Sequence, residues 1–488
     1  MAESLGNKTI KGTFWSAADA FLGQGVTFLV GIVLARILSP SEYGLIGIVL
    51  IFTTVLSGIV DSGFSTSLIR KNDTTDEDYN TMFITNMAMS LLVYTILFFC
   101  APLISYFFKR PELTNLTRVT GLILIFQALS IIQVTILTKR IDFKTKAKAS
   151  VVAAVTSGII GIAMAYTGFG VWSLVGQQLS NKLIYSICLW ILNKWWPKLK
   201  FNLSSFRYMW GFGWKMMLAG LLNNIWAQLY QVVVGRFYSP ATLGQYTRSK
   251  EYASLFSSNF TNIIQRVTYP ALSEIQDDKE RMVAACRRII KVCMFITSVL
   301  LISLGAVAEP FIYCLIGPQW HEAATYLPLI CISLSLYPLH AINLNMLQVM
   351  GRSDVILYLE IIKKVLAVFP LLLGIFVSIY WMLIGSIIMG VICIFLNTYY
   401  SGKKLNYSSW MQIKDIAPSY LVALVIALSV YFMKFLPLSN FAILPLQVVT
   451  GATVGFIVCK MLNLEEFNEL TQIVKNVFNR IKKRESIL

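Results

Sequence analysis

The sequence predicts an all-α polytopic membrane protein with about fourteen transmembrane helices, and three observations lead to this fold class. First, 56% of the 488 residues are hydrophobic and only 13% are charged, whereas soluble domains carry about 25% charged residues. Second, apolar runs of roughly 20 residues, each long enough to cross about 30 Å of hydrocarbon, recur along the whole chain. Third, the ~10-residue alternating segments of a β-barrel are absent from the sequence. Helices satisfy their backbone polar groups within one segment, so they are the expected architecture in lipid.

The apolar runs set the expected boundaries of the spans. We place the spans near 12–38, 42–66, 80–108, 113–138, 148–168, 171–193, 208–236, 241–268, 289–315, 322–350, 355–379, 381–401, 416–436 and 440–462. The connections are short, so none of them can fold as a separate catalytic domain. The first run is expected to be a retained span, because no signal-peptide cleavage site follows it. The charged tail at 464–488 is expected along the cytoplasmic membrane surface.

Basic residues are distributed unequally between the two sets of alternating connections. The chain has 41 Lys+Arg against 24 Asp+Glu, a formal net charge of +17. Thirty of the basic residues fall on the side that contains both termini, and only six fall on the other side. Cytoplasmic loops are enriched in Lys and Arg, so we expect a bacterial inner-membrane protein with both termini in the cytoplasm. The charge is then mostly topological, and no nucleic-acid partner is expected.

The eight cysteines and two histidines form no metal-binding or catalytic pattern. No CxxC spacing occurs, and most cysteines lie inside apolar runs, which is typical of free buried thiols. The histidines, His321 and His340, are far apart in the sequence. We therefore expect no metal, no cofactor and no enzymatic activity.

The pattern R-x-x-S-P-x-x-x-G occurs twice at an offset of 200 residues. It connects the first span to the second and the seventh span to the eighth, through Arg36, Ser39, Pro40 and Gly44 in one copy and Arg236, Ser239, Pro240 and Gly244 in the other. Arginine and Ser-Pro could each simply mark a helix end at the membrane interface, but that interpretation does not explain the shared offset. Six spans separate the copies, which predicts two six-helix lobes of the same orientation, related by a pseudo-two-fold axis along the membrane normal.

This repeat predicts the domain organisation. We expect an N-terminal lobe at 1–205, a C-terminal lobe at 206–402, two additional spans at 403–463 and a cytoplasmic tail at 464–488. Two facing lobes enclose a central cavity that can open to either side of the membrane, which is the usual physical basis of alternating access.

Polar residues at helical spacing within several spans are candidates for lining this cavity. Glycines and hydroxyls in such stripes are better explained as contacts between helices, and amides fit either role. A charge near mid-membrane costs at least about 2.5 kcal/mol, which favours a functional role for Arg248, Asp19 and Lys182. Arg266 and Asp61 lie nearer the cytoplasmic ends, where snorkelling is simpler. The cavity candidates are Arg248, Lys182, Arg266, Asn224, Gln228, Gln231, Asn259 and Asn262.

Three acidic residues are candidates for carrying a coupling proton or Na⁺: Asp19, Glu251 and Asp61. Arg248 and Glu251 are one helical turn apart, so these two could instead pair with each other without any substrate. Both interpretations stay open at the level of the sequence.

Short motifs spread from residue 11 to about 320 give the chain a family resemblance. They are Lys11-Gly12-Thr13-Phe14-Trp15, Leu34 to Pro40 with Tyr43-Gly44, Asp61-Ser62-Gly63-Phe64, Leu243 to Ser249, Tyr269 to Ser273, and Gly317-Pro318-Gln319-Trp320. With these motifs in this order, the chain resembles the polysaccharide transport (Wzx-type) flippases of the multidrug, oligosaccharidyl-lipid and polysaccharide exporter superfamily. Arg248 matches a basic position in that family's Y-x-R segment, whereas Ser249 stands where alanine is expected.

The resemblance implies a flippase that moves undecaprenyl-pyrophosphate-linked oligosaccharide from the cytoplasmic to the periplasmic leaflet, for O-antigen, capsule or exopolysaccharide assembly. It also implies a cationic central cavity, in which arginine would suit a pyrophosphate. The expected partners are this lipid-linked oligosaccharide, membrane lipid, a coupling H⁺ or Na⁺, and a polysaccharide polymerase with its chain-length protein. The alternatives are a peptidoglycan-precursor flippase, a drug/cation antiporter, or a membrane enzyme, which would need a larger periplasmic loop.

Overall fold

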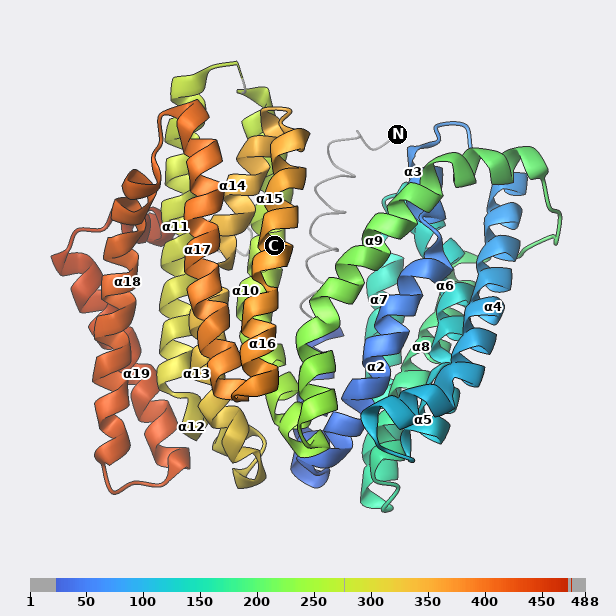
Figure 1. Ribbon diagram of the computed structural model, residues 1–488, viewed down its shortest axis with the longest axis horizontal. Coiled ribbons are helices and arrows are strands. Elements are labelled where there is room, and N and C mark those ends of the chain that lie inside the picture. The colour runs from blue at the N-terminus through green and yellow to red at the C-terminus, as the bar shows by residue number, and fades with distance from the viewer. Residues whose placement is uncertain (1–22, 276, 473–474, 476–488) are drawn as a thin grey trace, which may run out of the picture. The chain divides into compact units, whose positions relative to one another are not determined.

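The computed structural model describes residues 23–275, 277–472 and 475, without side chains at 258–260, 262–267, 269–271, 353 and 403–404. The described residues form helices joined by short connections, as Figure 1 shows. They divide into two compact units, Met1–Gly244 and Gln245–Leu488. The predicted all-α fold is confirmed, whereas the lobe boundaries near 205 and 402 and the count of fourteen spans stay predictions.

The first unit consists of helices that run up and down beside one another. They are Gly23–Ile37, α2 (Pro40–Asp61), α3 (Phe64–Arg70), α4 (Asp76–Phe108), α5 (Leu113–Thr120), α6 (Ile123–Lys139), α7 (Phe143–Tyr166), α8 (Val171–Asn193) and α9 (Leu203–Phe237). The next helix, α10 (Pro240–Glu274), begins in this unit and continues into the second one.

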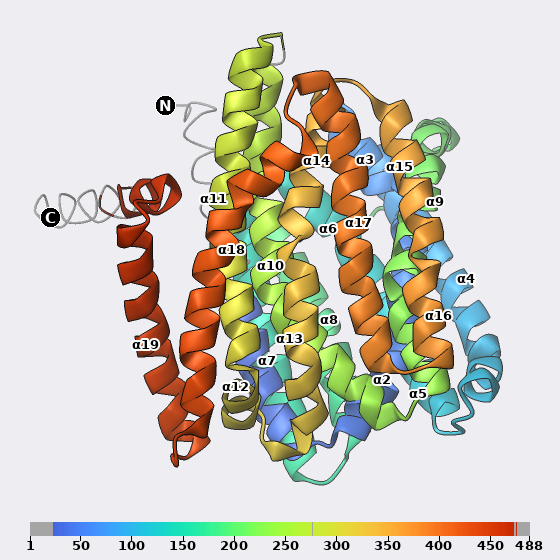
Figure 2. The same ribbon diagram turned by 60° about the vertical axis from the view of Figure 1, so that its left-hand side comes forward.

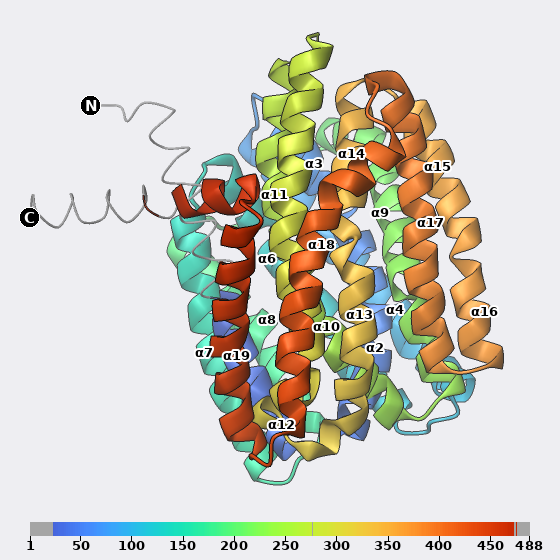
Figure 3. The same cartoon turned by 90° about the vertical axis from the view of Figure 1, so that its left-hand side faces the viewer.

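The second unit continues with a similar arrangement of upright helices, which Figure 2 shows from another side. They are α11 (Lys279–Ala306), α12 (Ala308–Leu315), η1 (Pro318–Trp320), α13 (His321–Ser335), α14 (Tyr337–Val349), α15 (Ser353–Leu366), α16 (Val368–Phe376), α17 (Ile379–Leu405), α18 (Ser409–Phe432), η2 (Met433–Phe435) and α19 (Asn440–Met461). The last two long helices, α18 and α19, pack against each other (Figure 3).

Several predicted spans are interrupted where the backbone cannot continue a helix. The span predicted at 42–66 breaks at Ser62 and Gly63, which both have a positive φ. The span predicted at 322–350 breaks before Pro338, because proline cannot donate to the carbonyl of Leu334. The Ser257 hydroxyl donates to that carbonyl instead, at 2.9 Å, so the polar group freed by the proline is still satisfied.

The helix starts follow from local capping residues. Ser39 and Thr75 each form a complete capping box, with Glu42 and with Asp78 respectively. Asn202 accepts hydrogen bonds from the first backbone amides of α9. These side chains satisfy amides that have no partner within the helix, so the sequence determines where these helices begin.

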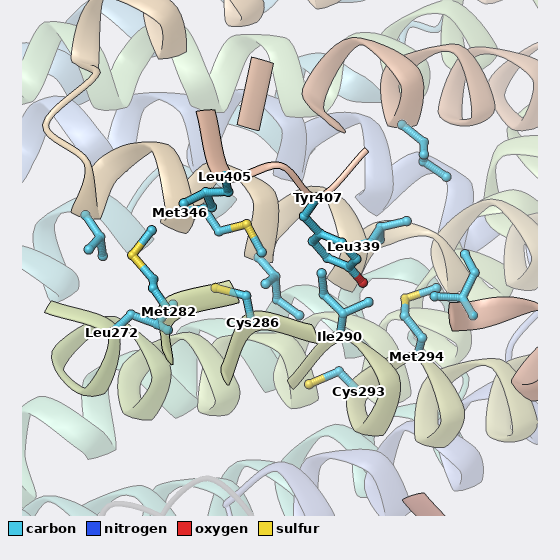
Figure 4. Packing of buried hydrophobic residues seen from close by; sticks show 14 of the residues in the cluster. Leu272, Met282, Cys286, Ile290, Cys293, Met294, Leu339, Met346, Leu405 and Tyr407 are labelled. Carbon is cyan, nitrogen blue, oxygen red and sulfur yellow. The ribbon is translucent and has the colours of Figure 1, made fainter. Parts of the chain in front are cut away.

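The core of the second unit gathers side chains from α10, α11, α14 and α17. Figure 4 shows part of this buried cluster, including Leu272, Cys286, Ile290, Leu339 and Met346. All eight cysteines of the chain are free, as their spacing predicts. The thiols therefore act as small apolar packing groups.

Candidate functional site

Polarity separates three long helices from the other spans. In the described part of the chain, nine helical stretches are long and apolar enough to cross a membrane, and α8, α9 and α10 are not among them although each has more than 20 residues. These three helices carry the stripes from which most of the predicted cavity residues were taken. Polar faces on membrane helices turn toward protein or water and away from lipid.

On α8, two adjacent residues have different surroundings. Asn181 donates from Nδ2 to the Ser157 hydroxyl of α7 at 3.1 Å, so this amide is a contact between helices. The neighbouring Lys182 side chain is exposed, and within the described residues it makes no ion pair. Lys182 thus presents a cation on a face of α8 that the α7 contact does not cover.

On α9, the polar stripe lies partly against α2. The two helices run antiparallel: Gly213 contacts Gly63, Asn224 lies beside Gly58, and Gly235 lies beside Ile48. A methyl group on Gly58 would come within 3.1 Å of the Asn224 Nδ2. Asn224 therefore packs between helices, which fits the role of small residues and amides in membrane interfaces.

Gln228 and Gln231 follow Asn224 by one and two turns of α9, and both are partly buried. The Oε1 atom of Gln228 is buried and finds no hydrogen-bond donor in the described part of the chain. A buried amide oxygen without a donor costs about 1–3 kcal/mol. A ligand or a water molecule that donated a hydrogen bond to this oxygen would remove that cost.

On α10, Arg248 and Glu251 form an ion pair. The Arg248 residue is 8% exposed, and its Nη1 lies 2.6 Å from the Glu251 Oε2. The Glu251 side chain is 52% exposed, so one carboxylate oxygen accepts from the arginine while the group still faces the surface of its unit. The pairing of Arg248 with Glu251 that the sequence allowed is therefore present. This ion pair reduces the free-energy cost of burying Arg248.

Lys250 was not selected from the sequence. It lies between Arg248 and Glu251 on α10, is partly buried, and makes no ion pair among the described residues. The sequence signal for Lys250 is its position inside a predicted span. A single lysine does not form a stripe of polar residues at helical spacing, so it was not selected. Like Lys182, it is a lysine of the three polar helices that has no ion pair among the described residues.

Four predicted residues cannot be placed. Asp19 lies outside the described residues, and the side chains of Asn259, Asn262 and Arg266 lie outside the described part of α10. Their roles stay predictions.

Asp61 stands at the break between α2 and α3. The Ser65 hydroxyl donates to its Oδ1, and Thr135 of α6 lies 3.0 Å from the Ser65 Oγ. No described basic side chain forms an ion pair with this carboxylate. The Ser65 hydroxyl stabilises a partly buried carboxyl group that has no counter-ion among the described residues, so the proton-carrying role of Asp61 stays a prediction.

The two copies of the turn motif have the same local structure and contact each other. Ser39 and Ser239 each accept a hydrogen bond from an amide in the first turn of the following helix, and Pro40 and Pro240 start those helices. Gly44 packs on the carbonyl of Pro240, and Gly244 packs on the carbonyl of Pro40. Arg236 lies over the Phe107 ring at 5.2 Å, while Arg36 is exposed at the end of the first described helix.

The second unit contains buried polar networks that the sequence interpretation missed. Arg287 of α11 donates from two nitrogens to Asp415 of α18, at 2.6 Å each, and the Tyr407 hydroxyl donates to the same carboxylate at 2.7 Å. Burial and this hydrogen bond raise the pKa of Tyr407 well above its usual value. Asn343 and Gln412 form a neighbouring amide pair. The sequence signal for this network is an acidic residue, Asp415, directly before the apolar span predicted at 416–436.

The fold is shared with solved exporters of small and lipid-linked molecules. The lipid II flippase MurJ in an inward closed conformation matches with a TM-score of 0.71 at 14% identity, over 92% of this chain and 98% of that chain. An inward-facing multidrug resistance MATE family transporter of the MOP superfamily matches with a TM-score of 0.61 at 15% identity, over 81% of this chain and 98% of that chain. The protein is a multi-pass helical membrane protein with the fold of these transporters.

Residues 33–325 match the model of a family described as polysaccharide biosynthesis protein, and the chain belongs to that family. The succinoglycan biosynthesis transport protein ExoT of Rhizobium meliloti (strain 1021) is 25% identical over 366 residues, covering 75% of this chain and 74% of that protein. The teichuronic acid biosynthesis protein TuaB of Bacillus subtilis (strain 168) is 24% identical over 361 residues, covering 73% and 74%. The lipopolysaccharide biosynthesis protein WzxC of Escherichia coli (strain K12) is 23% identical over 385 residues, covering 76% of each. The predicted family resemblance is confirmed.

Proposed function

We propose that this protein is a flippase that moves undecaprenyl-pyrophosphate-linked oligosaccharide from the cytoplasmic to the periplasmic leaflet of the bacterial inner membrane. The translocated units would then be assembled into O-antigen, capsule or exopolysaccharide. The observation that carries the proposal is the family match, which spans residues 33–325 and so includes both copies of the turn motif. The transport and biosynthesis proteins named among its relatives support the same class of substrate.

The charges on the three polar helices fit an anionic head group. A pyrophosphate loses its hydration when it enters a protein-lined path, and fixed cations with several donors can replace that hydration. Lys182 and Lys250 supply cations without a described counter-ion, and Arg248 supplies a guanidinium whose carboxylate partner is half exposed. A phosphate could displace Glu251 from Arg248, which would couple substrate binding to release of an acidic group.

The orientation follows from the charge distribution. Basic residues concentrate on the side that contains both termini, and the positive-inside rule assigns that side to the cytoplasm. The head group would enter from the cytoplasmic side, while the lipid tail stays in the bilayer. The transport path would then open alternately to the two sides of the membrane.

Deletion of the gene followed by glycan analysis tests this function. We expect surface polysaccharide to disappear and the lipid-linked precursor to accumulate, with both effects reversed by a plasmid-borne copy. A peptidoglycan-precursor flippase would instead be required for cell-wall growth. A drug/cation antiporter would leave surface glycan unchanged and alter drug sensitivity, so unchanged glycan and precursor levels would contradict the proposal.

A further inference from the structure

A groove of about 500 Å³ opens between α7 and α8, inside the first unit. Its volume falls in the range of small-molecule sites, about 300–1,000 Å³. The lining is apolar except for Lys148 of α7, and its apolar side chains include Val151, Val152, Cys188, Ile191 and Leu192. We call this feature the α7–α8 groove.

The α7–α8 groove lies at the basic end of these two helices. α7 and α8 are antiparallel neighbours (Figure 3): Asn181 donates to Ser157, and Leu189 shares a buried cluster with Ala149. The start of α7 therefore lies beside the end of α8, where Lys194 follows the last helical residue. In the orientation proposed above, the positive-inside rule places this end at the cytoplasmic surface.

The exposed face of α7 changes from basic to apolar toward the middle of the helix. Lys144, Lys148, Val152 and Val155 follow one another at spacings of four and three residues, so they share this face. All four residues are exposed. Lys148 makes no ion pair among the described residues, so its charge is available to a ligand in the groove.

On α8, the groove lies on the face opposite Lys182. Ile191 follows Lys182 by nine residues, about two and a half turns of about 3.6 residues each, so the two side chains point in opposite directions. Ile191 and Leu192 are exposed apolar residues directly before Asn193 and Lys194. An exposed apolar face on a membrane helix suits lipid chains, which are as apolar as leucine. The groove is therefore separate from the cavity wall predicted at Lys182.

We infer that the α7–α8 groove binds an acyl chain of an anionic phospholipid, with the lipid phosphate at Lys148. The order of basic and then apolar residues along the groove matches the order of head group and chain in such a lipid. Basic pockets between membrane helices on the cytoplasmic side bind anionic head groups. A zwitterionic lipid would fill the apolar walls equally well, but it brings its own cation beside the phosphate. The inference goes beyond the proposed function and uses only its orientation.

Photo-crosslinking in the full-length protein tests which lipid occupies the groove. Val152 is replaced by the photoreactive residue p-benzoylphenylalanine, and the protein is reconstituted into nanodiscs. The nanodiscs contain equal amounts of phosphatidylglycerol and phosphatidylcholine with the same acyl chains. Ultraviolet light attaches neighbouring chains, and mass spectrometry measures the amount of each lipid adduct. The matched control carries the same photoreactive residue at Leu92, an exposed apolar position on α4 outside the groove.

We expect phosphatidylglycerol adducts at position 152 to exceed phosphatidylcholine adducts by about fivefold, which corresponds to about 1 kcal/mol for one lysine. The two adducts should be nearly equal at position 92. Lys148→Gln should bring the ratio at position 152 close to one, whereas Lys148→Arg should preserve it. High salt should also lower the ratio, because it screens the attraction between the charges.

Four outcomes would overturn the inference. Equal adducts at position 152 would make the groove an ordinary lipid boundary, and a crosslink within the protein without any lipid adduct would mean that the chain itself covers the groove. Enrichment that survives Lys148→Gln would remove the lysine from the site. Loss of the phosphatidylglycerol adducts when an equal amount of undecaprenyl phosphate is added would assign the groove to the transported class of lipid. No outcome requires transport, so a failure here is distinguishable from a failure of the deletion experiment.

Discussion

At the scale of single residues, Arg248 is a charged side chain in a nearly buried position. Its guanidinium is held by Glu251 on the same helix, one turn away. A cation retained only for this pair would become unnecessary once the carboxylate is removed. A cation that binds substrate would be needed whether or not Glu251 is present.

We therefore predict that Arg248→Ala lowers surface polysaccharide by about tenfold or more in a complementation assay, whereas Arg248→Lys retains part of it. Hydrogen bonds to charged groups contribute about 1.5–3 kcal/mol, and 1.4 kcal/mol is tenfold in an equilibrium. The double variant Arg248→Ala with Glu251→Ala should be as defective as Arg248→Ala alone. Recovery of polysaccharide in the double variant would assign the arginine to the ion pair only.

A second residue-scale prediction concerns Asp415. The buried carboxylate accepts from Arg287 twice and from Tyr407 once. Asp415→Ala removes all three hydrogen bonds and should destabilise the detergent-solubilised protein by about 2–3 kcal/mol. Tyr407→Phe removes one and should cost about 1 kcal/mol. Thermal unfolding measures both, and equal losses for the two variants would contradict a shared carboxylate site.

Local spacing allowed some of these contacts to be predicted. Arg248 and Glu251 are three residues apart on one helix, so their pairing could be foreseen. Asp415 and Arg287 are 128 residues apart, and no helical period connects them. The position of Asn224 against Gly58 likewise depends on which helices become neighbours, which a single sequence does not specify.

At the scale of elements, the break between α2 and α3 is a steric feature. Gly63 has a φ of +69°, and a methyl group there would come within 2.5 Å of the Gly213 carbonyl oxygen on α9. Gly168 has a φ of +84° but meets nothing within 4 Å. Both glycines have a left-handed backbone that strains any other residue. Only Gly63 also has a neighbouring helix in contact.

Gly168→Ala should therefore cost only the strain of a left-handed residue, about 1–2 kcal/mol. Gly63→Ala should cost clearly more, since α9 must move away from α2. The midpoint of thermal unfolding in detergent compares the two variants. Similar midpoints would mean that the Gly63–Gly213 approach does not contribute to stability.

The linker between α8 and α9 is a second element with a specific attachment. The Lys198 amide donates to the Asn80 Oδ1 at 2.7 Å, and the Asn202 amide donates to the Thr81 hydroxyl at 3.0 Å, both on α4. These contacts hold a lysine-containing segment against the end of α4.

Asn80→Ala should release this linker and accelerate trypsin cleavage between 194 and 200 by about fivefold. The reason is that one hydrogen bond contributes about 1 kcal/mol net to the attached state, which is a factor of about five in its population. Asn72→Ala, at an exposed position, is the control and should cleave at the unmodified rate. Cleavage measured in inside-out vesicles gives the comparison, and equal rates for the two variants would contradict the attachment.

Element positions were largely predictable from hydropathy, but their interruptions were not. The periodic apolar runs predict where a span exists. Whether a run continues as one helix depends on single residues such as Pro338, and on whether a partner like Ser257 can satisfy the freed carbonyl. That partner comes from another helix, so the break becomes visible only in the assembled unit.

At the scale of the whole molecule, composition and the internal repeat predict the architecture. The low charged fraction predicts a helical membrane protein, and the duplicated turn motif predicts two related halves. The structure adds that the two copies of this motif pack against each other, with Gly44 on the Pro240 carbonyl and Gly244 on the Pro40 carbonyl. It also separates three long polar helices, α8, α9 and α10, from the nine apolar stretches of the described residues.

The most direct test of the central claim is translocation by the purified protein. Lipid-linked oligosaccharide is incorporated into liposomes with and without the protein, and the fraction reached by an added glycosidase is followed over time. We predict that the protein makes the protected inner-leaflet fraction accessible, and that Arg248→Ala protein at the same density does not. A protected fraction that stays constant with the unmodified protein, under either direction of a proton or Na⁺ gradient, would contradict the account.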